Sequence, residues 1–128
     1  MQKKEAIRYM ENAKKILSNS PVEDNVYTDI KYVKSACGVA YLGVLKAIDE
    51  YLLSKGLTAK ELPRKAEEYE KALQKYASVH DGKLLKQFDR IYNELHIAGY
   101  YRGLLKGADT VKDAIKAAKE FINKLRLQ

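Results

Sequence analysis

The segment ACGVAYLGVLKAIDEYLL, from Ala36 to Leu53, decides the fold class of this chain. Its first ten residues carry no charge and are apolar on every side, so a helix formed here must be covered on every side. Small residues recur along one face of it, at Ala36, Ala40, Gly43 and Ala47. This spacing lets a neighbouring helix backbone approach closely. We therefore predict a buried central helix, and the expected close neighbour is the later helix that carries Gly99.

The composition is typical of one ordered domain spanning residues 1–128, with 46% hydrophobic and 32% charged residues. A net charge of +7 permits attraction to polyanions, although seventeen acids interrupt the basic residues. Ten tyrosines against two phenylalanines suit half-buried positions at helix margins or interfaces. The lone Cys37 predicts a buried thiol, and no uncharged segment approaches the roughly 20 residues that span a bilayer. We therefore expect a cytoplasmic protein with no membrane partner.

Apolar residues at helical spacing predict helices over residues 3–18, 27–54, 63–79, 83–106 and 110 to near the end. No stretch alternates in the manner of a strand. The helix over 63–79 has only a narrow apolar stripe among many charges and should lie on the outside. The expected fold is all-α, an up-and-down antiparallel helical bundle of four long helices plus one shorter peripheral helix.

Local signals set the expected helix boundaries. Gly56 and Gly107 are placed to end helices. Thr110 with Asp113 three residues later resembles a capping box. In the turn before residue 83, Asp81 is an expected N-cap and His80 an exposed turn residue.

The helix over 83–106 has two apolar faces. A core stripe runs through Leu85, Phe88, Tyr92, Leu95 and Gly99. A second set, Ile97, Tyr101 and Leu104, points well away from that stripe. An outward apolar set predicts a second packing surface, either for another helix of the chain or for a second subunit. We expect a homodimer through this face. Gly99 and Gly103 within the helix suggest close backbone approach.

The usual chemical signatures are absent, since the chain has no glycine-rich phosphate loop and no paired Cys or His at ligand spacing. No cofactor and no metal are therefore predicted. The remaining polar constellation lies on the helix over 83–106. Asp89, Asn93, His96 and Tyr100 fall in one narrow strip of an α-helix, and Arg90 lies about 120° round from His96.

This constellation admits a chemical and a structural interpretation. A histidine can transfer protons near neutral pH, and an arginine can hold a phosphate, which together suit metal-free RNA cleavage by the 2′-hydroxyl. Alternatively, Arg90 pairs with Glu94 across one turn, and His96 is a boundary residue bonded to Asn93, Tyr100 or water.

Three segments of the chain resemble HEPN domains: AYLGVLKAIDEYLLSKGL at 40–57, LLKQFDRIYNELHIAGYY at 84–101 and DAIKAAKEFINKL at 113–125. The likeness covers about residues 27–126. Catalytic members of that family resemble one another in an Arg followed by four to six residues and a His, and Arg90 with His96 is an Arg-x5-His. The family's polar residue after the Arg is replaced here by Ile91.

The resemblance implies a metal-independent ribonuclease that works at a homodimer cleft. Arg90 would bind the scissile phosphate and His96 would transfer protons, with Asn93 and Tyr100 in support. A second alignment places His96 at the family's Arg position and leaves no catalytic pair. The expected function is RNA cleavage or RNA binding in a toxin, defence or RNA-processing role. The alternatives are a non-catalytic helical module for dimerisation or protein interaction, and a binder of anionic nucleotides or RNA without chemistry.

Overall fold

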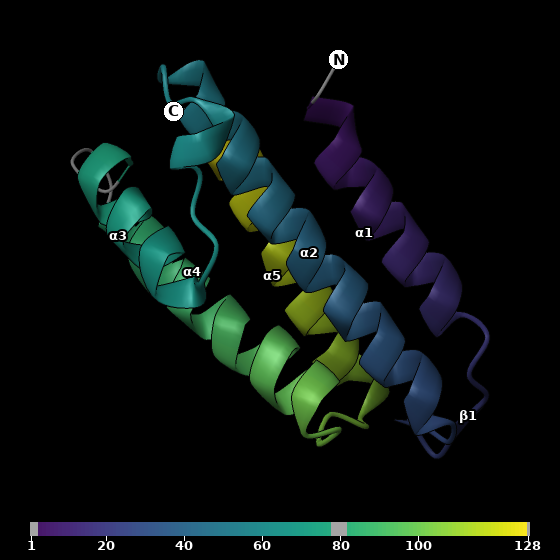
Figure 1. Ribbon diagram of the computed structural model, residues 1–128. Coiled ribbons are helices and arrows are strands. Elements are labelled where there is room, and N and C mark those ends of the chain that lie inside the picture. The colour runs from purple at the N-terminus through teal and green to yellow at the C-terminus, as the bar shows by residue number, and fades with distance from the viewer. Residues whose placement is uncertain (1–2, 78–81, 128) are drawn as a thin grey trace.

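Helices form nearly all of the regular structure in the computed structural model, which describes residues 3–77 and 82–127 (Figure 1). They are α1 (Lys3–Leu17), α2 (Ile30–Ser54), the 3-10 turn η1 (Ala59–Glu61), α3 (Ala66–Tyr76), α4 (Lys83–Ile91), the π-helix η2 (Tyr92–Tyr101) and α5 (Ala108–Arg126). The predicted all-α bundle is confirmed, with α3 as its shorter peripheral helix. The predicted turn at His80 and Asp81 lies outside the described residues.

The central helix is α2, which packs against α1, α5 and η2 (Figure 1). Its small-residue face meets α1, because a Cβ on Gly43 would lie 2.8 Å from Tyr9 Cβ and 3.3 Å from the Ala6 carbonyl oxygen. The prediction that this face meets the helix of Gly99 is therefore wrong at Gly43. The close contact with η2 exists, but Cys37 and Gly38 make it.

Polar and glycine caps set the two ends of α2. Asp29 is the N-cap, and its carboxylate accepts a bond from the Lys31 backbone N–H at 3.3 Å. At the other end Gly56 has φ +102°, and the Leu57 N–H donates to the Leu52 carbonyl at 3.2 Å. This is the Schellman arrangement that a C-terminal glycine allows. Gly56 therefore ends the helix as predicted, whereas the start lies at Ile30 and not at residue 27.

A small hairpin occupies the connection before α2, where no strand was expected. Strands β1 (Val22–Glu23) and β2 (Val26–Tyr27) pair antiparallel around Asp24 and Asn25, whose φ values are +50° and +62°. A two-residue loop with both φ values positive suits the twist of a hairpin, and Asp and Asn tolerate it. The Asp-Asn pair was thus the sequence signal for this turn.

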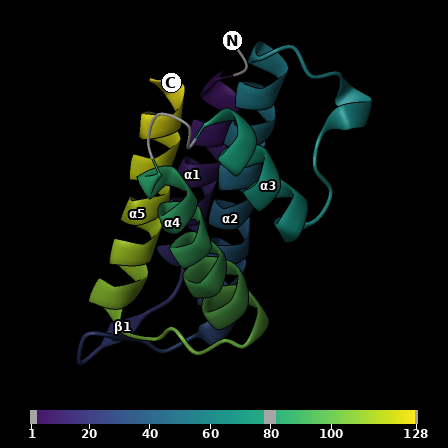
Figure 2. The same cartoon turned by 90° about the vertical axis from the view of Figure 1, so that its left-hand side faces the viewer.

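The hairpin also binds the segment that leads into α5. The Tyr27 N–H donates to the Lys106 carbonyl and the Ala108 N–H donates to the Asn25 carbonyl, both at 2.9 Å. Figure 2 shows these segments together at one end of the bundle, with both termini at the other. Helix α5 consequently starts at Ala108 with Gly107 as its N-cap. Gly107 does not end the preceding helix, and the expected box of Thr110 with Asp113 does not form the cap.

The fourth predicted helix ends at Tyr101 instead of residue 106. Its second half is the π-helix η2, and Gly103 follows it with φ +61°. The Leu104 N–H then donates to the Ala98 carbonyl at 2.8 Å, which turns the chain away. Gly103 therefore serves a reversal after the helix and not close packing within it, which corrects the expectation for this residue.

Helix α3 begins at Ala66 and not at Pro63, because η1 and an extended segment occupy residues 59–65. Two tyrosine hydroxyls tie α3 to α2. The Tyr69 hydroxyl donates to Asp49 Oδ1, and the Tyr51 hydroxyl donates to the Tyr76 carbonyl, each at 2.9 Å. These bonds hold α3 beside α2 near its start, at Tyr69, and at its last residue, Tyr76. In the described part of the chain no helix has the length and apolar character needed to cross a membrane.

Candidate functional site

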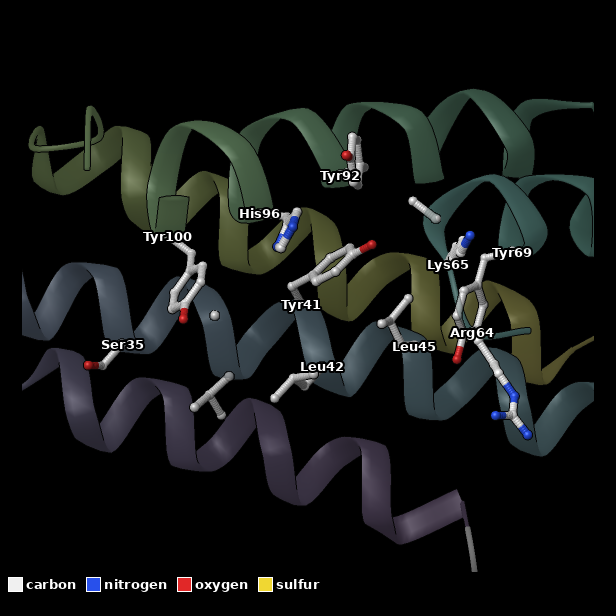
Figure 3. A pocket seen from close by; sticks show the side chains of 13 residues that line it. Ser35, Tyr41, Leu42, Leu45, Arg64, Lys65, Tyr69, Tyr92, His96 and Tyr100 are labelled. Carbon is white, nitrogen blue, oxygen red and sulfur yellow. The ribbon is translucent and has the colours of Figure 1, made fainter. Parts of the chain in front are cut away.

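An open groove of about 620 Å³ lies between α2, η2 and the start of α3 (Figure 3). Its lining is mostly aromatic and aliphatic, with two cations. The lining residues are Ser35, Gly38, Val39, Tyr41, Leu42, Leu45, Arg64, Lys65, Ala66, Tyr69, Tyr92, His96 and Tyr100. A concave apolar surface with a few polar groups is typical of a ligand site.

A row of aromatic rings forms one part of the groove. The His96 ring stacks on Tyr41 with centroids 4.8 Å apart and on Tyr100 with centroids 6.0 Å apart. Tyr92 lies 5.4 Å from His96 by the same measure. Figure 3 shows His96 between Tyr100 and Tyr41. In the π-helix residues four apart remain near one face, whereas its wider turn carries residues three apart to different faces.

Glycine brings this row close to α2. A Cβ on Gly38 would lie 2.7 Å from Tyr100 Cδ1, so only glycine lets the Tyr100 ring rest directly on the α2 backbone. A Cβ on Gly99 would lie 2.7 Å from Cys37 Sγ. The two glycines together seat η2 against α2 and thereby fix the position of the rings.

Buried aromatic residues of the core pack against the rings of the groove. Phe88 is fully buried, and its ring centroid lies 6.4 Å from those of Tyr41 and Tyr69 and 6.3 Å from that of Phe121. Burial is the main cause that raises the pKa of Tyr41 to about 12, and the nearby Tyr92 and Glu70 contribute to that rise. Tyr41 is therefore a neutral hydroxyl at physiological pH, able to donate a hydrogen bond to a ligand.

Two cations stand at the opposite end of the groove (Figure 3). Arg64 and Lys65 are exposed and lie on the extended segment before α3. The backbone N–H of Arg64 donates to Glu68 Oε1 at 2.6 Å, which fixes the segment. Neither cationic side chain forms an ion pair with another residue of the described ranges. Both charges are therefore available to an anion.

The structure places the predicted polar residues on different faces. His96 and Tyr100 line the groove, as their shared strip suggested. Asn93 is exposed outside it and donates through Nδ2 to the Asp89 carbonyl at 2.9 Å. Tyr92 takes the place expected for Asn93, because the π-helix changes the angular spacing that an α-helix would give.

Arg90 lies away from the groove. Its guanidinium pairs with the Glu94 carboxylate, and it also faces Asp113 and Glu120 on α5. These carboxylates raise the pKa of Arg90, with the Glu94 hydrogen bond as the largest cause. Within one chain Arg90 and His96 therefore do not face one common site. The ion pair between Arg90 and Glu94 is the structural interpretation of Arg90 that the sequence allowed.

No group of three or more His, Cys, Asp or Glu side chains in the described ranges is arranged to hold a metal. Cys37 is fully buried, and burial raises its pKa to about 12. A neutral thiol packed against Gly99 serves the helix contact and not chemistry.

The residues that sequence reasoning missed are Tyr41, Tyr92, Arg64 and Lys65. The abundance of tyrosine was a signal for them, since half-buried tyrosines mark margins and interfaces. These residues come from α2, η2 and the segment before α3. The periodicity of one helix does not show which residues of another element pack beside it.

The outward apolar set predicted as a dimer face is largely exposed. Tyr101 is 73% exposed and Leu104 is 59% exposed, while Ile97 is half-buried. No described residue covers Tyr101 or Leu104 enough to bury it. The set thus remains an apolar surface on the bundle.

Comparisons with known proteins place the chain in a family. No protein with curated annotation matches it significantly. The solved structure of a protein of unknown function from Dyadobacter fermentans is similar, with a TM-score of 0.81 and 35% sequence identity over 97% of this chain and 93% of that chain. The family model described as a domain of unknown function, DUF5618, matches residues 1–126. The chain therefore belongs to the DUF5618 family.

Proposed function

We propose that this protein binds single-stranded RNA, whose unpaired bases stack on the rings of the groove. The Tyr100 ring carries the proposal, because it lines the groove, is 47% exposed and stacks on His96, which in turn stacks on the buried Tyr41. Stacking of a base on an aromatic side chain contributes about 1 to 3 kcal/mol and tolerates any base. The net charge of +7 favours approach of a polyanion.

The resemblance to HEPN domains supports RNA as the partner, in a toxin, defence or RNA-processing system. Cleavage would need Arg90 and His96 on one phosphate. In one chain Glu94 holds Arg90 on the side of α5, whereas His96 lies on the side of α2. Binding is therefore the activity that a single chain supports, and cleavage would require a second subunit to complete the site.

Fluorescence anisotropy with a labelled, unstructured uridine oligomer tests the binding. We expect affinity that falls steeply with added salt. His96→Ala and Tyr100→Ala should each weaken binding about fivefold to a hundredfold, since each removes a ring of the stacked row. Tyr101→Ala is the matched control, because this tyrosine is exposed outside the groove. Wild-type affinity in both groove variants would contradict the proposal.

The same oligomer and a structured RNA, incubated with the protein in EDTA, separate cleavage from binding. Cleavage that disappears in both Arg90→Ala and His96→Ala supports the metal-independent ribonuclease. Bound but intact RNA leaves binding as the function and removes catalysis by this pair.

A second candidate function is dimerisation or protein interaction through the Ile97, Tyr101 and Leu104 face. The observation that favours it is the 73% exposure of a large aromatic ring beside Leu104. In equilibrium sedimentation we expect a wild-type dimer and a Tyr101→Glu monomer. Leu127→Glu is the control, since Leu127 is also apolar and is 85% exposed, but it follows the C-terminal end of α5, whereas Leu104 precedes the start of that helix. A Tyr101→Glu protein that still dimerises would exclude this face.

A further inference from the structure

We infer that the groove accommodates one nucleotide, with its base against the exposed ring of Tyr100 and its phosphate at Arg64 and Lys65. The inference rests on the proposed RNA binding and specifies the ligand as a nucleoside monophosphate unit. Such a unit is either the phosphorylated end of an RNA or a free nucleotide. The two sources share the same chemistry, and the experiment below distinguishes them.

The size of the groove fits a single small ligand. Its volume of about 620 Å³ falls within the roughly 300 to 1,000 Å³ of small-molecule sites. A nucleic-acid duplex would need a broad basic surface, whereas this groove is mostly apolar and lies between α2, η2 and the start of α3. One nucleotide is therefore the unit that its shape selects.

The two ends of the groove have different chemistry. The stacked rings of Tyr41, His96 and Tyr100 lie at the η2 end, and the exposed cations stand beside Tyr69 where α3 begins (Figure 3). Leu42 and Leu45 line the stretch between them and offer only apolar contact. A nucleotide has the same division, with a flat ring at one end and a dianionic phosphate at the other.

The charges of the neighbouring acids favour one orientation. Glu70 faces Tyr41 closely enough to raise the pKa of its hydroxyl, so a phosphate at Tyr41 would be repelled. Glu68 lies near Arg64 and Lys65, but its carboxylate accepts the Arg64 backbone N–H and caps the start of α3. The Arg64 guanidinium remains able to grip a phosphate through two parallel N–H bonds. The phosphate is therefore expected at the Arg64 end.

Titration calorimetry with adenosine monophosphate, uridine monophosphate and adenosine tests the inference. Both monophosphates should bind, and adenosine should bind at least about tenfold more weakly, because it lacks the charged contact. Arg64→Gln combined with Lys65→Gln should remove this difference. Lys60→Gln combined with Lys71→Gln is the matched control, since it removes two exposed charges outside the lining.

The source of the ligand follows from the uridine oligomer with and without a 5′-phosphate. Tighter binding of the phosphorylated oligomer, lost in the Arg64 and Lys65 double variant, identifies an RNA end. Competition by monophosphates without such a gain identifies a free nucleotide. RNA binding that is unaffected by either monophosphate and by the double variant would overturn the inference while leaving the proposed function intact. A protein that binds no RNA would instead overturn the proposed function itself.

Discussion

Replacing Phe88 by alanine is expected to lower the free energy of unfolding by about 3 to 5 kcal/mol. The side chain is fully buried and touches the rings of Tyr41, Tyr69 and Phe121, so its loss leaves a cavity where α2, α3 and α5 meet α4. Urea denaturation followed by circular dichroism measures the change. The total free energy of unfolding of such a domain is roughly 5 to 15 kcal/mol, so this loss is a large fraction of it. The variant should therefore unfold at a clearly lower temperature than the wild type.

Phe88→Leu serves as the graded control, with an expected loss of about 1 to 2 kcal/mol because most of the buried volume remains. The two variants should also differ in the groove, since Phe88 supports the Tyr41 ring. If Phe88→Ala lowered the free energy of unfolding by less than Phe88→Leu, the Phe88 ring would not be a packed part of the core.

Gly99→Ala is expected to cost about 2 to 3 kcal/mol, an overpacking effect at the upper end of its usual range. The new Cβ would lie 2.7 Å from Cys37 Sγ, 2.8 Å from Cys37 Cβ and 3.1 Å from the Glu94 carbonyl oxygen. Helix η2 can relieve the two contacts with Cys37 only by moving away from α2, since the Glu94 carbonyl belongs to η2 itself. Such a movement should also expose Cys37, so a faster reaction of its thiol with a disulfide reagent accompanies the loss of stability.

A second glycine provides the comparison. A Cβ on Gly82 meets nothing within 4 Å, and its φ of −61° suits any residue, so Gly82→Ala should change stability by less than about 0.5 kcal/mol. Cys37→Gly should restore part of what Gly99→Ala removes, because the two changes act at one contact. Strictly additive losses in the double variant would show that the contact is not the cause.

Much of the fold follows from local patterns. The uncharged start of the segment Ala36–Leu53 required burial on every side, and α2 is the central helix. Gly56 ends it because a left-handed residue is needed there. The errors lie where longer-range bonds overrule a local pattern. Tyr27 continues the apolar spacing of α2, but its backbone N–H is bound to Lys106 from far along the chain.

The site was predictable only in part. His96 and Tyr100 were grouped by their spacing, and they do line one groove. The assumption of a uniform α-helix put Asn93 beside them, whereas the change to π geometry at Tyr92 turned Asn93 outward. Arg64 and Lys65 join the site through the packing of α3 on α2, which depends on the bond from Tyr69 to Asp49. A contact of this kind leaves no trace in the periodicity of either helix.

The hairpin at the base of the bundle has a consequence for how the molecule opens. Its bonds to Lys106 and Ala108 close a ring of chain that contains α2, α3, α4 and η2, and hence the whole groove. Fraying of the start of α5 must break the same bonds as fraying of β2. Strand β2 and the start of α5, which are far apart in the sequence, therefore open as one cooperative unit. The hydrogen bonds between them limit how far α2 and η2 can separate at the groove.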